Sequence, residues 1–357
     1  MSGSLTSPQH FVHQVIGHQP DTLNKLMPVN TQGHGIAPVN IALSKYWGKR
    51  DTVLNLPMNG SVSISLPGLG TETTITLKPT AKNSSPQGGT EKIPPPIDHI
   101  TLNGKALKPN DPFCIRLHAF LDLFRPENHI FHINTHNTVP TAAGLASSAS
   151  GYAALVLALN DLYQWQLTPQ KLSLLARLGS GSACRSLYSG FALWHKGTQT
   201  DGLDSYAEPI ETQWPELCVG LVKINVQQKP ISSTTGMQNT VNTCDLYQAW
   251  PQQAEKDMQK ILEAIKQKNF EQLGQTAEHN ALSMHATMMA TWPPIVYWQP
   301  ESLAAMQTVW QLRQQGVALY FTMDAGPNLK LLFLETQKPA ITQAFGEIDI
   351  IQPFKAK

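Results

Sequence analysis

A cluster of cationic and aromatic side chains follows the first apolar strand pattern of the chain. Residues 45–50 read Lys-Tyr-Trp-Gly-Lys-Arg, so three cations fall within six residues, although only 14% of the protein is charged. Cations bind phosphates, aromatic rings form walls, and glycine lets a ligand approach the backbone closely. The cluster therefore indicates a site for a small polyanion. The alternative is that Lys45 and Lys49 are solvated lysines at the end of a strand.

A second segment, Pro140 to Gly151, consists almost entirely of small residues and stands at the start of an apolar helical pattern. Small residues let consecutive backbone N–H groups face one anion, and a helix N-terminus adds partial positive charge. The hydroxyls of Ser147 and Ser148 could donate to phosphate oxygens or reach a magnesium ion. No Gly-Lys-Ser/Thr follows, so the segment is not a Walker A loop. Close packing of a small-residue helix on its neighbour fits the same pattern.

Two further loops each carry one charged side chain that could act on a substrate. Arg185 stands in the Gly- and Ser-rich run 179–186, and a guanidinium can bind a carboxylate through two parallel hydrogen bonds. Asp324 stands between two strand patterns, where catalytic groups are often mounted. The simpler interpretations are a solvated loop arginine and an aspartate that caps its own turn. The run 232–237 is another hydroxyl-rich loop that would suit phosphate.

The elements that position these side chains follow from the apolar periodicity. In the first half we expect strands at 36–43, 61–66, 71–77, 99–102, 130–134 and 190–194 and helices at 111–124, 148–163 and 168–178. After residue 215 we expect strands at 217–226, 317–322, 329–335 and 348–351 and helices at 251–268, 270–291, 300–315 and 339–345. This pattern favours an α+β protein of two domains. The Pro-, Gly- and Ser-rich stretch 79–96 is expected to be a long surface loop.

The composition excludes several classes of protein. With 26 Lys+Arg against 25 Asp+Glu, the 357-residue chain lacks the basic excess of a nucleic-acid or membrane-surface binder. No run is long and apolar enough to span a membrane, and the first 33 residues lack the apolar core of a signal peptide. Four cysteines without metal-type or disulfide spacing are typical of a reducing cytoplasm. We interpret residues 1–33 as a loosely ordered extension.

Taken together and in order, these segments resemble one known family. Residues 37–51 resemble the N-terminal signature of diphosphomevalonate decarboxylases, residues 54–63 the segment that follows it, and residues 140–151 the family's phosphate loop. Shorter similar runs lie at 179–186, 232–237, 293–294 and 323–328. The resemblance implies the two-domain GHMP kinase fold, with a ribosomal-S5-like N-terminal domain at 34–214 and a ferredoxin-like C-terminal domain at 215–357. It also implies ATP, Mg2+ and a homodimer.

The resemblance also implies a role for each segment. The substrate would be mevalonate 5-diphosphate, whose tertiary hydroxyl is phosphorylated by ATP before phosphate and carbon dioxide leave to give isopentenyl diphosphate. Asp324 would contact that hydroxyl, Lys45 would offset charge at the transferring phosphoryl group, and Arg185 would align the carboxylate. The other substrate-binding residues would be Ser61 and, around the diphosphate, Tyr46, Lys49, Ser180, Ser182 and Met237. The ATP phosphates would lie against Pro140, Ala143, Gly144, Leu145, Ala146, Ser147 and Ser148, the last also near magnesium.

The sequence leaves other functions open. Sibling enzymes include a decarboxylase that acts on mevalonate 5-phosphate and a mevalonate 3-kinase. The joint presence of Lys45, Arg185 and Asp324 favours decarboxylation over phosphorylation alone. The Gly- and Ser-rich loops would also suit a serine hydrolase of the Ser-Ser-Lys amidase type, which an active-site serine probe would label. A catalytically silent protein on the same fold would bind its ligands without turnover.

Overall fold

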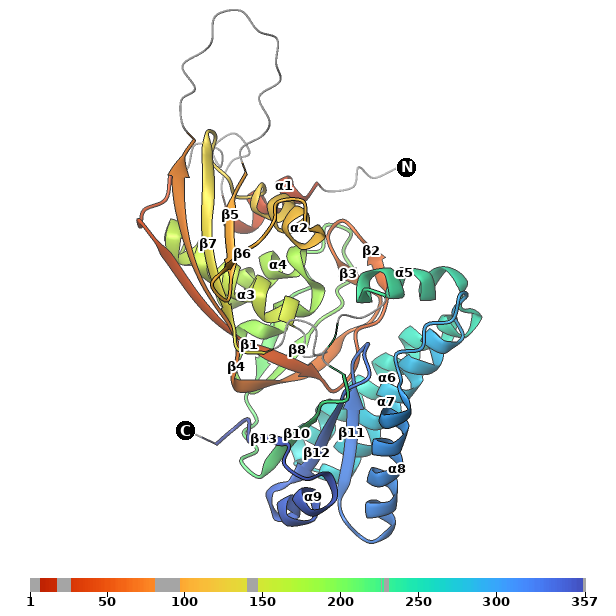
Figure 1. Cartoon of the computed structure of the whole chain (residues 1–357). Helices are drawn as coiled ribbons and strands as arrows, with labels where there is room; N and C mark the ends of the chain where they lie inside the picture. Colours follow the sequence, from red (N-terminus) through yellow and green to blue (C-terminus); the bar gives the residue numbers. More distant parts are fainter. Residues whose placement is uncertain are drawn as a thin grey trace, which may run out of the picture.

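The structure is a computed structural model that describes residues 7–17, 27–80, 97–139, 147–225, 227 and 231–355. Its strands form a seven-stranded sheet in the first half of the chain, a four-stranded sheet in the second half and a two-stranded ribbon. In Figure 1 the first half, red to green, lies above the second half, cyan to blue. The two halves meet where α6 (Trp250–Gln267) contacts β4 (Ser61–Pro79).

The seven-stranded sheet is built around β4, which pairs with three other strands. These are β1 (Gly33–Ala42), β7 (His129–Asn137) and β8 (Phe191–Trp194). The sheet is completed by β5 (His99–Leu102), β6 (Lys105–Ala106) and β9 (Ala207–Ile210). We expected two separate strands at 61–66 and 71–77, and this was wrong. They form one strand, because residues 67–69 bulge out opposite the bond between Pro38 and Val39 while the pairing with β1 continues on both sides.

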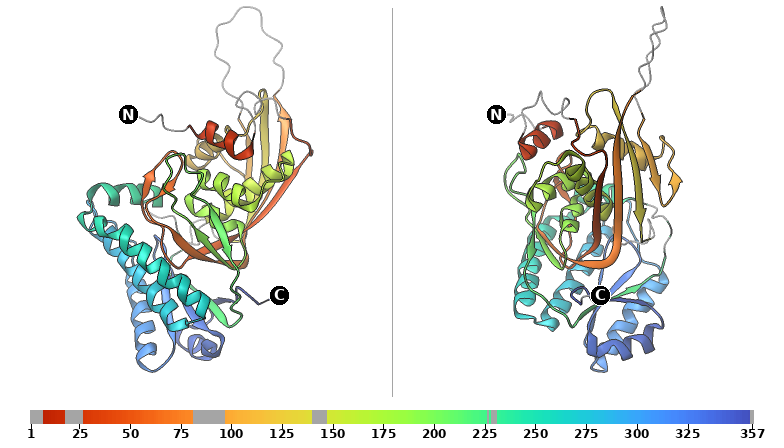
Figure 2. Two further views of the ribbon diagram at one scale, coloured as in Figure 1. Left: turned by 180° about the vertical axis from the view of Figure 1, so that it is seen from behind. Right: turned by 90° about the vertical axis from the view of Figure 1, so that its left-hand side faces the viewer.

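Helices cover one face of this sheet (Figure 2). They are α2 (Pro112–Leu121), α3 (Ser147–Tyr163) and α4 (Pro169–Gly179), followed by the short 3-10 helix η2 (Gly181–Leu187). The central helix α3 packs on β1 and β4. A Cβ at Gly35 would lie 2.2 Å from the carbonyl oxygen of Ala154. The close approach of α3 to β1 therefore depends on glycine at this position.

A further helix, α1 (Pro8–Ile16), precedes the sheet and belongs to the same core. Its buried side chains are Phe11, Val12, Val15 and Ile16. It contacts α4, where the guanidinium carbon of Arg177 lies 5.0 Å from the centre of the Phe11 ring. The expectation of a loosely ordered extension is therefore wrong for residues 7–17, because apolar side chains at helical spacing give this segment a face to bury. The described part of the chain does not include residues 1–6 and 18–26 of the predicted extension. It also does not include residues 81–96 of the predicted loop.

The four-stranded sheet is antiparallel and has the order β11-β12-β10-β13. Its strands are β10 (Leu217–Val222), β11 (Leu319–Met323), β12 (Leu329–Leu334) and β13 (Asp349–Ile351). The helices are α5 (Ser233–Thr243), α6, α7 (Phe270–Met289), α8 (Pro300–Gln314) and α9 (Lys338–Phe345), with short 3-10 turns at Asp245–Ala249 and Glu335–Gln337. Read along the chain, the sheet has the order 4-1-3-2 of a ferredoxin-like domain, as expected. Figure 2 shows the long helices along one face of this sheet, where α7 and α8 contact β11.

The two halves share one hydrophobic cluster. Ile41 and Val62 of the first sheet pack in it with Val219 of the second sheet and with Met258 and Leu273 from the helices. Each such side chain contributes about 1.5–3 kcal/mol when it is fully buried. The shared cluster fixes the end of β1 against the second half of the chain. The chain passes from the seven-stranded sheet to the four-stranded sheet between β9 and β10.

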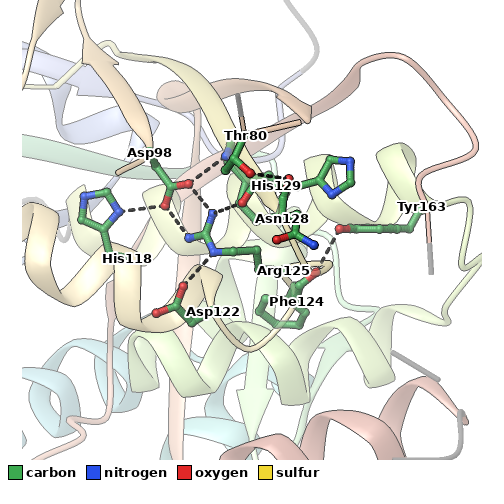
Figure 3. Close-up of polar contacts among 10 residues, drawn as sticks. Thr80, Asp98, His118, Asp122, Phe124, Arg125, Asn128, His129 and Tyr163 are labelled. Carbon is green, nitrogen blue, oxygen red and sulfur yellow. Dashed lines mark hydrogen bonds and ion pairs between the residues drawn. The ribbon is translucent and has the colours of Figure 1, made fainter. Parts of the chain in front are cut away.

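A buried ion network around Asp98 and Arg125 connects separate segments of the first half of the chain (Figure 3). Asp98 accepts hydrogen bonds from Arg125 Nη2 at 2.6 Å, from the backbone N–H of Phe131 at 2.7 Å and from His118 Nδ1 at 2.7 Å. Its side chain is 0% exposed. Burial alone would raise the pKa of Asp98, but the hydrogen bonds from Arg125 and Phe131 outweigh burial and lower it. The network joins the segment before β5 to α2 and β7.

We expect Asp98→Asn to lower the free energy of unfolding by about 3 kcal/mol, because it removes one partner of a buried ion pair. The folded pKa of Asp98 lies below its unfolded value of about 3.9. The contribution of ionised Asp98 to the free energy of unfolding is therefore complete above its unfolded pKa. It is lost as the pH falls through the folded pKa. Urea unfolding at pH 7 measures the loss. Asp122→Asn is the control, since Asp122 is 61% exposed and bonds the same Arg125, and it should cost below about 1 kcal/mol. Equal losses in the two variants would contradict this role for Asp98.

Candidate active site

The two halves of the chain meet at an ion pair between Lys45 and Asp324. Lys45 Nζ lies 2.9 Å from Asp324 Oδ1. Lys45 follows the end of β1, and Asp324 directly follows β11. The Lys45 side chain is 2% exposed, whereas that of Asp324 keeps 25% of its surface accessible. A ligand can therefore reach the carboxylate while the cation beneath it stays covered.

A second lysine, which we did not predict, lies at the other oxygen of this carboxylate. Lys330 Nζ is 3.1 Å from Asp324 Oδ2, and its side chain is 2% exposed. Lys330 stands on β12 opposite Thr322 of β11, so the register of this hairpin places it beside Asp324. The sequence did contain a signal, because Lys330 is the one charged residue in the otherwise apolar strand Leu329–Leu334. A lysine in a buried strand needs a partner.

The protonation of the centre follows from these contacts. Burial alone opposes ionisation of Asp324, but the charges of Lys45 and Lys330 outweigh it and hold the pKa of this carboxyl far below its usual range. Burial lowers the pKa of Lys45 to about 8, against the attraction of Asp324. Asp324 therefore stays ionised at neutral pH, whereas the proton of Lys45 is more easily lost than that of an exposed lysine.

Buried amide groups hold the backbone around Lys45. Asn280 Oδ1 accepts from the backbone N–H of Lys45 at 2.7 Å, and Asn59 Nδ2 donates to the Lys45 carbonyl at 2.8 Å. Asn280 in turn donates to Asp257 Oδ2 at 3.0 Å, which fixes the orientation of its amide. Burial lowers the pKa of His285 to about 3. This imidazole is therefore neutral and donates through Nε2 to the backbone carbonyl of Asp324 at 3.1 Å.

Arg185 is the third predicted catalytic residue, and it lies in η2 with only 2% of its surface exposed. Its Nη1 donates to Ser61 Oγ, and its Nη2 donates to Asn40 Oδ1 at 3.3 Å. Within the described ranges its Nε has no hydrogen-bond partner. Burial lowers the pKa of Arg185, and the Asp324 carboxylate acts in the opposite direction, so the two charges lie within electrostatic range. Ser61 thus holds the guanidinium in place.

Three residues predicted for the diphosphate end lie at or beside the start of η2. The hydroxyls of Ser180 and Ser182 are 3.5 Å apart. The ring of Tyr46 packs edge-on against Trp194, with ring centres 4.8 Å apart. The Tyr46 hydroxyl is buried and finds no hydrogen-bond partner among the residues with defined positions. It is therefore a donor that a bound oxyanion could use.

Lys49 and Met237 have partners within the protein. Lys49 is the first residue of β2 (Lys49–Asp51), which pairs with β3 (Leu56–Pro57), and it donates to Asn55 Oδ1 at 2.6 Å. Burial lowers the pKa of Lys49. Met237 of α5 is 6% exposed and packs in an apolar cluster with Trp47. The ring of Trp47, which is 2% exposed, is buried among the apolar side chains of this cluster.

The remaining residues of the cationic cluster contact other parts of the protein. Arg50 donates to the backbone carbonyls of residues 196 and 199, and Asp51 caps the backbone N–H of residue 54. Gly48 has a φ of 103°, and a Cβ there would lie 1.7 Å from the hydroxyl oxygen of Tyr247. The group that approaches the backbone at Gly48 is thus a side chain of the protein.

Two of the predicted nucleotide-binding residues, Ser147 and Ser148, lie at the start of α3. Ser148 stands in its first turn and is exposed, so its hydroxyl is open to a ligand. Ser147 is the first residue of the helix. The described residues do not include the other predicted positions, which are Pro140, Ala143, Gly144, Leu145 and Ala146. Within the described ranges, no helix is both long and apolar enough to cross a membrane.

Solved structures share this architecture. A structure of the mevalonate diphosphate decarboxylase from Staphylococcus aureus matches with a TM-score of 0.81 and 38% identity, over 90% of this chain and 95% of that chain. One from Enterococcus faecalis matches with a TM-score of 0.79 and 40% identity, over 91% of this chain and 98% of that chain. A third, solved with MVAPP, AMPPCP and magnesium, has a TM-score of 0.80 and 40% identity over 91% and 98% of the two chains. The fold and the charged centre define an enzyme of the GHMP kinase class.

Family models cover nearly the whole described chain. Residues 37–207 match the diphosphomevalonate decarboxylase-like N-terminal domain, and residues 219–352 match the mevalonate 5-diphosphate decarboxylase C-terminal domain. The diphosphomevalonate decarboxylase of Aspergillus fumigatus is 37% identical over 85% of this chain and 77% of its own length. That of Bos taurus is 37% identical over 84% and 76%. The chain belongs to the diphosphomevalonate decarboxylase family and is an ATP-dependent decarboxylase.

Proposed function

We propose that the chain converts mevalonate 5-diphosphate and ATP to isopentenyl diphosphate, ADP, phosphate and carbon dioxide, with Asp324, Lys45 and Arg185 at the reacting centre. The observation that carries this assignment is the Lys45–Asp324 pair, which joins the two halves of the chain at 2.9 Å and leaves the carboxylate accessible. Both the phosphoryl transfer and the loss of carbon dioxide need fixed charges around one tertiary carbon. The pair and Arg185 supply them.

Asp324 acts first, on the tertiary hydroxyl of the substrate. Because its pKa is held low by two lysines, this carboxylate is a weak base. It orients the hydroxyl by accepting its hydrogen bond, and it takes the proton only as the oxygen–phosphorus bond forms. Lys45 offsets the charge that develops on the transferring phosphoryl group. When phosphate departs, the negative charge of Asp324 stabilises the electron-poor carbon.

Arg185 acts in the second step, on the carboxylate that leaves as carbon dioxide. Its guanidinium is held by Ser61 and Asn40, so it offers fixed donors to the substrate. Holding the carboxylate aligns the breaking carbon–carbon bond with the electron-poor carbon, and this alignment lowers the entropic part of the barrier. The electron pair of the breaking carbon–carbon bond forms the new double bond to the electron-poor carbon, and the carboxylate leaves as carbon dioxide.

The remaining predicted residues bind the two phosphate-bearing ends. Tyr46, Lys49, Ser180 and Ser182 hold the substrate diphosphate, and Met237 supports them by packing against Trp47. Ser148 and the segment before it hold the ATP phosphates at the N-terminus of α3. The exposed Ser148 hydroxyl fits a magnesium site, since Mg2+ keeps several waters and binds through few protein oxygens and the phosphates. When bound, the ion neutralises charge on those phosphates.

We also propose that the enzyme acts as a homodimer in the cytoplasm. The family resemblance supports the dimer, and light scattering at two protein concentrations tests it. All four cysteines are free and buried, and burial raises the pKa of Cys184 to about 12. Unpaired buried thiols support a reducing compartment.

A substrate panel tests the proposed function. ATP and magnesium are supplied with mevalonate, its 5-phosphate or its 5-diphosphate, and the release of ADP and of carbon dioxide is followed separately for each. We expect kcat/KM to be at least about 100-fold higher for the diphosphate, because Lys49 and the hydroxyl donors act on charges that the other substrates lack. Faster turnover of the monophosphate would instead identify a monophosphate decarboxylase. Labelling by an active-site serine probe without ADP release would identify a hydrolase.

A further inference from the structure

The centre contains one more charged side chain than the proposed chemistry uses. Lys45 and Lys330 each lie beside one oxygen of Asp324, at 2.9 and 3.1 Å, and both side chains are 2% exposed. A single carboxylate needs one counter-ion. Burying two ammonium groups beside one carboxylate costs desolvation free energy for each of them. The presence of the second lysine therefore indicates that it has a function.

We propose that Lys330 is a positioning residue for the reaction, the permanent counter-ion of Asp324 that leaves the charge of Lys45 available to the transferring phosphoryl group. This inference rests on the proposed function. If Lys45 alone faced Asp324, the two charges would cancel, and the pair would present no net charge to an incoming phosphate. Lys330 restores one positive charge to the pair. It also fixes Oδ2 of the carboxylate, so that Oδ1 stays on Lys45.

The placement of Lys330 supports a fixed role. It stands in the middle of the C-terminal sheet, on β12 between β10 and β11, opposite Leu221 and Thr322. Its Nζ also lies 3.5 Å from the backbone carbonyl of Asn328. Lys45, by contrast, lies beyond the end of its strand and donates to the carbonyl of Ala42 at 2.8 Å. Lys330 is thus anchored within a paired strand, while Lys45 stands on a segment that reaches into the centre.

The charges around Asp324 determine what removal of Lys330 does to titration. The groups that face the carboxylate are Lys45, Lys330 and Arg185, with neutral His285 on its backbone carbonyl. Lys330 repels the charge of Lys45 and so adds to the lowering of the Lys45 pKa. Without Lys330, this repulsion ends, and Lys45 becomes the sole close cationic partner of the carboxylate among the described residues. Both changes raise the pKa of Lys45.

The test compares Lys330→Met, Lys330→Gln and the wild-type enzyme in the kcat/KM–pH profile for mevalonate 5-diphosphate. In the wild type we expect the alkaline limb near pH 8, where Lys45 loses its proton. In both variants we expect kcat to fall at least about tenfold, KM to change less than about threefold and the alkaline limb to move to higher pH. Lys223→Met is the matched control, because it removes an exposed lysine–aspartate pair of the same domain and should change none of these.

Several outcomes would overturn this role for Lys330. One is a variant that folds, as judged by circular dichroism, and keeps the wild-type kcat and alkaline limb. Another is a fall in kcat with an unmoved limb, which would indicate a merely structural lysine. If neither variant folds, the wild-type profile still tests the proposal. An alkaline limb above about pH 10, the ordinary range of a lysine, would show that the charge of Lys330 does not lower the pKa of Lys45 and would contradict the proposal. Failure of the proposed function itself is distinguishable, since the wild-type enzyme would then not turn over mevalonate 5-diphosphate at all.

Discussion

Asp324→Asn is expected to reduce turnover at least about 1,000-fold, with ATP affinity changed less than about threefold. The substitution removes the negative charge that orients the substrate hydroxyl and later faces the electron-poor carbon. It also leaves Lys45 and Lys330 without their common partner. The predicted ATP site, at the start of α3, is built from a different part of the chain. Both ADP and carbon dioxide should therefore fail to appear, because the first step is blocked.

The measurement follows ADP and carbon dioxide release and, separately, ATP binding by calorimetry. Asp349→Asn is the control, since this aspartate is 59% exposed and pairs with Lys223 at 2.6 Å. We expect the control to keep the wild-type rate. If purified Asp324→Asn released phosphate and carbon dioxide at nearly the wild-type rate, Asp324 would not belong to the reacting centre.

Arg185→Gln is expected to act on the second step. Phosphorylation should continue, because Lys45 and Asp324 keep their contact, but carbon dioxide should form at least about 100-fold more slowly. Glutamine keeps a donor near Ser61 but loses the charge and the fork geometry that bind a carboxylate. A phosphorylated intermediate should therefore accumulate, with ADP appearing before carbon dioxide.

Rapid-quench measurements in a single turnover separate these steps. Arg185→Lys is the matched variant, because it keeps the charge but not the two parallel donors, and we expect an intermediate rate. The two predictions also differ from each other, since Asp324→Asn stops ADP formation and Arg185→Gln uncouples it from decarboxylation. Equal slowing of ADP and carbon dioxide in Arg185→Gln would contradict a role for Arg185 in the second step.

The sequence predicted this fold and the main part of this centre for identifiable reasons. Periodicity located the strands that end at Ala42 and Met323 and the long helices between them, because alternation and helical spacing are local properties. Residue type then singled out Lys45, Arg185 and Asp324, which the structure places within electrostatic range of one another. Taken alone, Arg185 and Asp324 did not stand out from their simpler interpretations, whereas Lys45 did because of its neighbours Tyr46 and Trp47. The ordered set of motifs carried the prediction.

What the sequence did not predict depends on contacts between distant segments. Lys330 lies beside Asp324 only because β12 pairs with β11. Asn280 contacts the backbone of Lys45 only because α7 packs against the residues after β1. The extension before β1 was misread because its polar composition hid one short amphipathic face. In the same way, Gly48 pointed to a ligand until the Tyr247 hydroxyl was placed against it.

The central claim is that one buried centre couples ATP hydrolysis to decarboxylation. The most direct test is the ratio of carbon dioxide to ADP released by the wild-type enzyme from carboxyl-labelled mevalonate 5-diphosphate with ATP and magnesium. We predict one carbon dioxide for each ADP, because Asp324 and Arg185 act on the hydroxyl and on the carboxylate of the same bound substrate molecule. ADP without carbon dioxide would identify a kinase and would contradict this account.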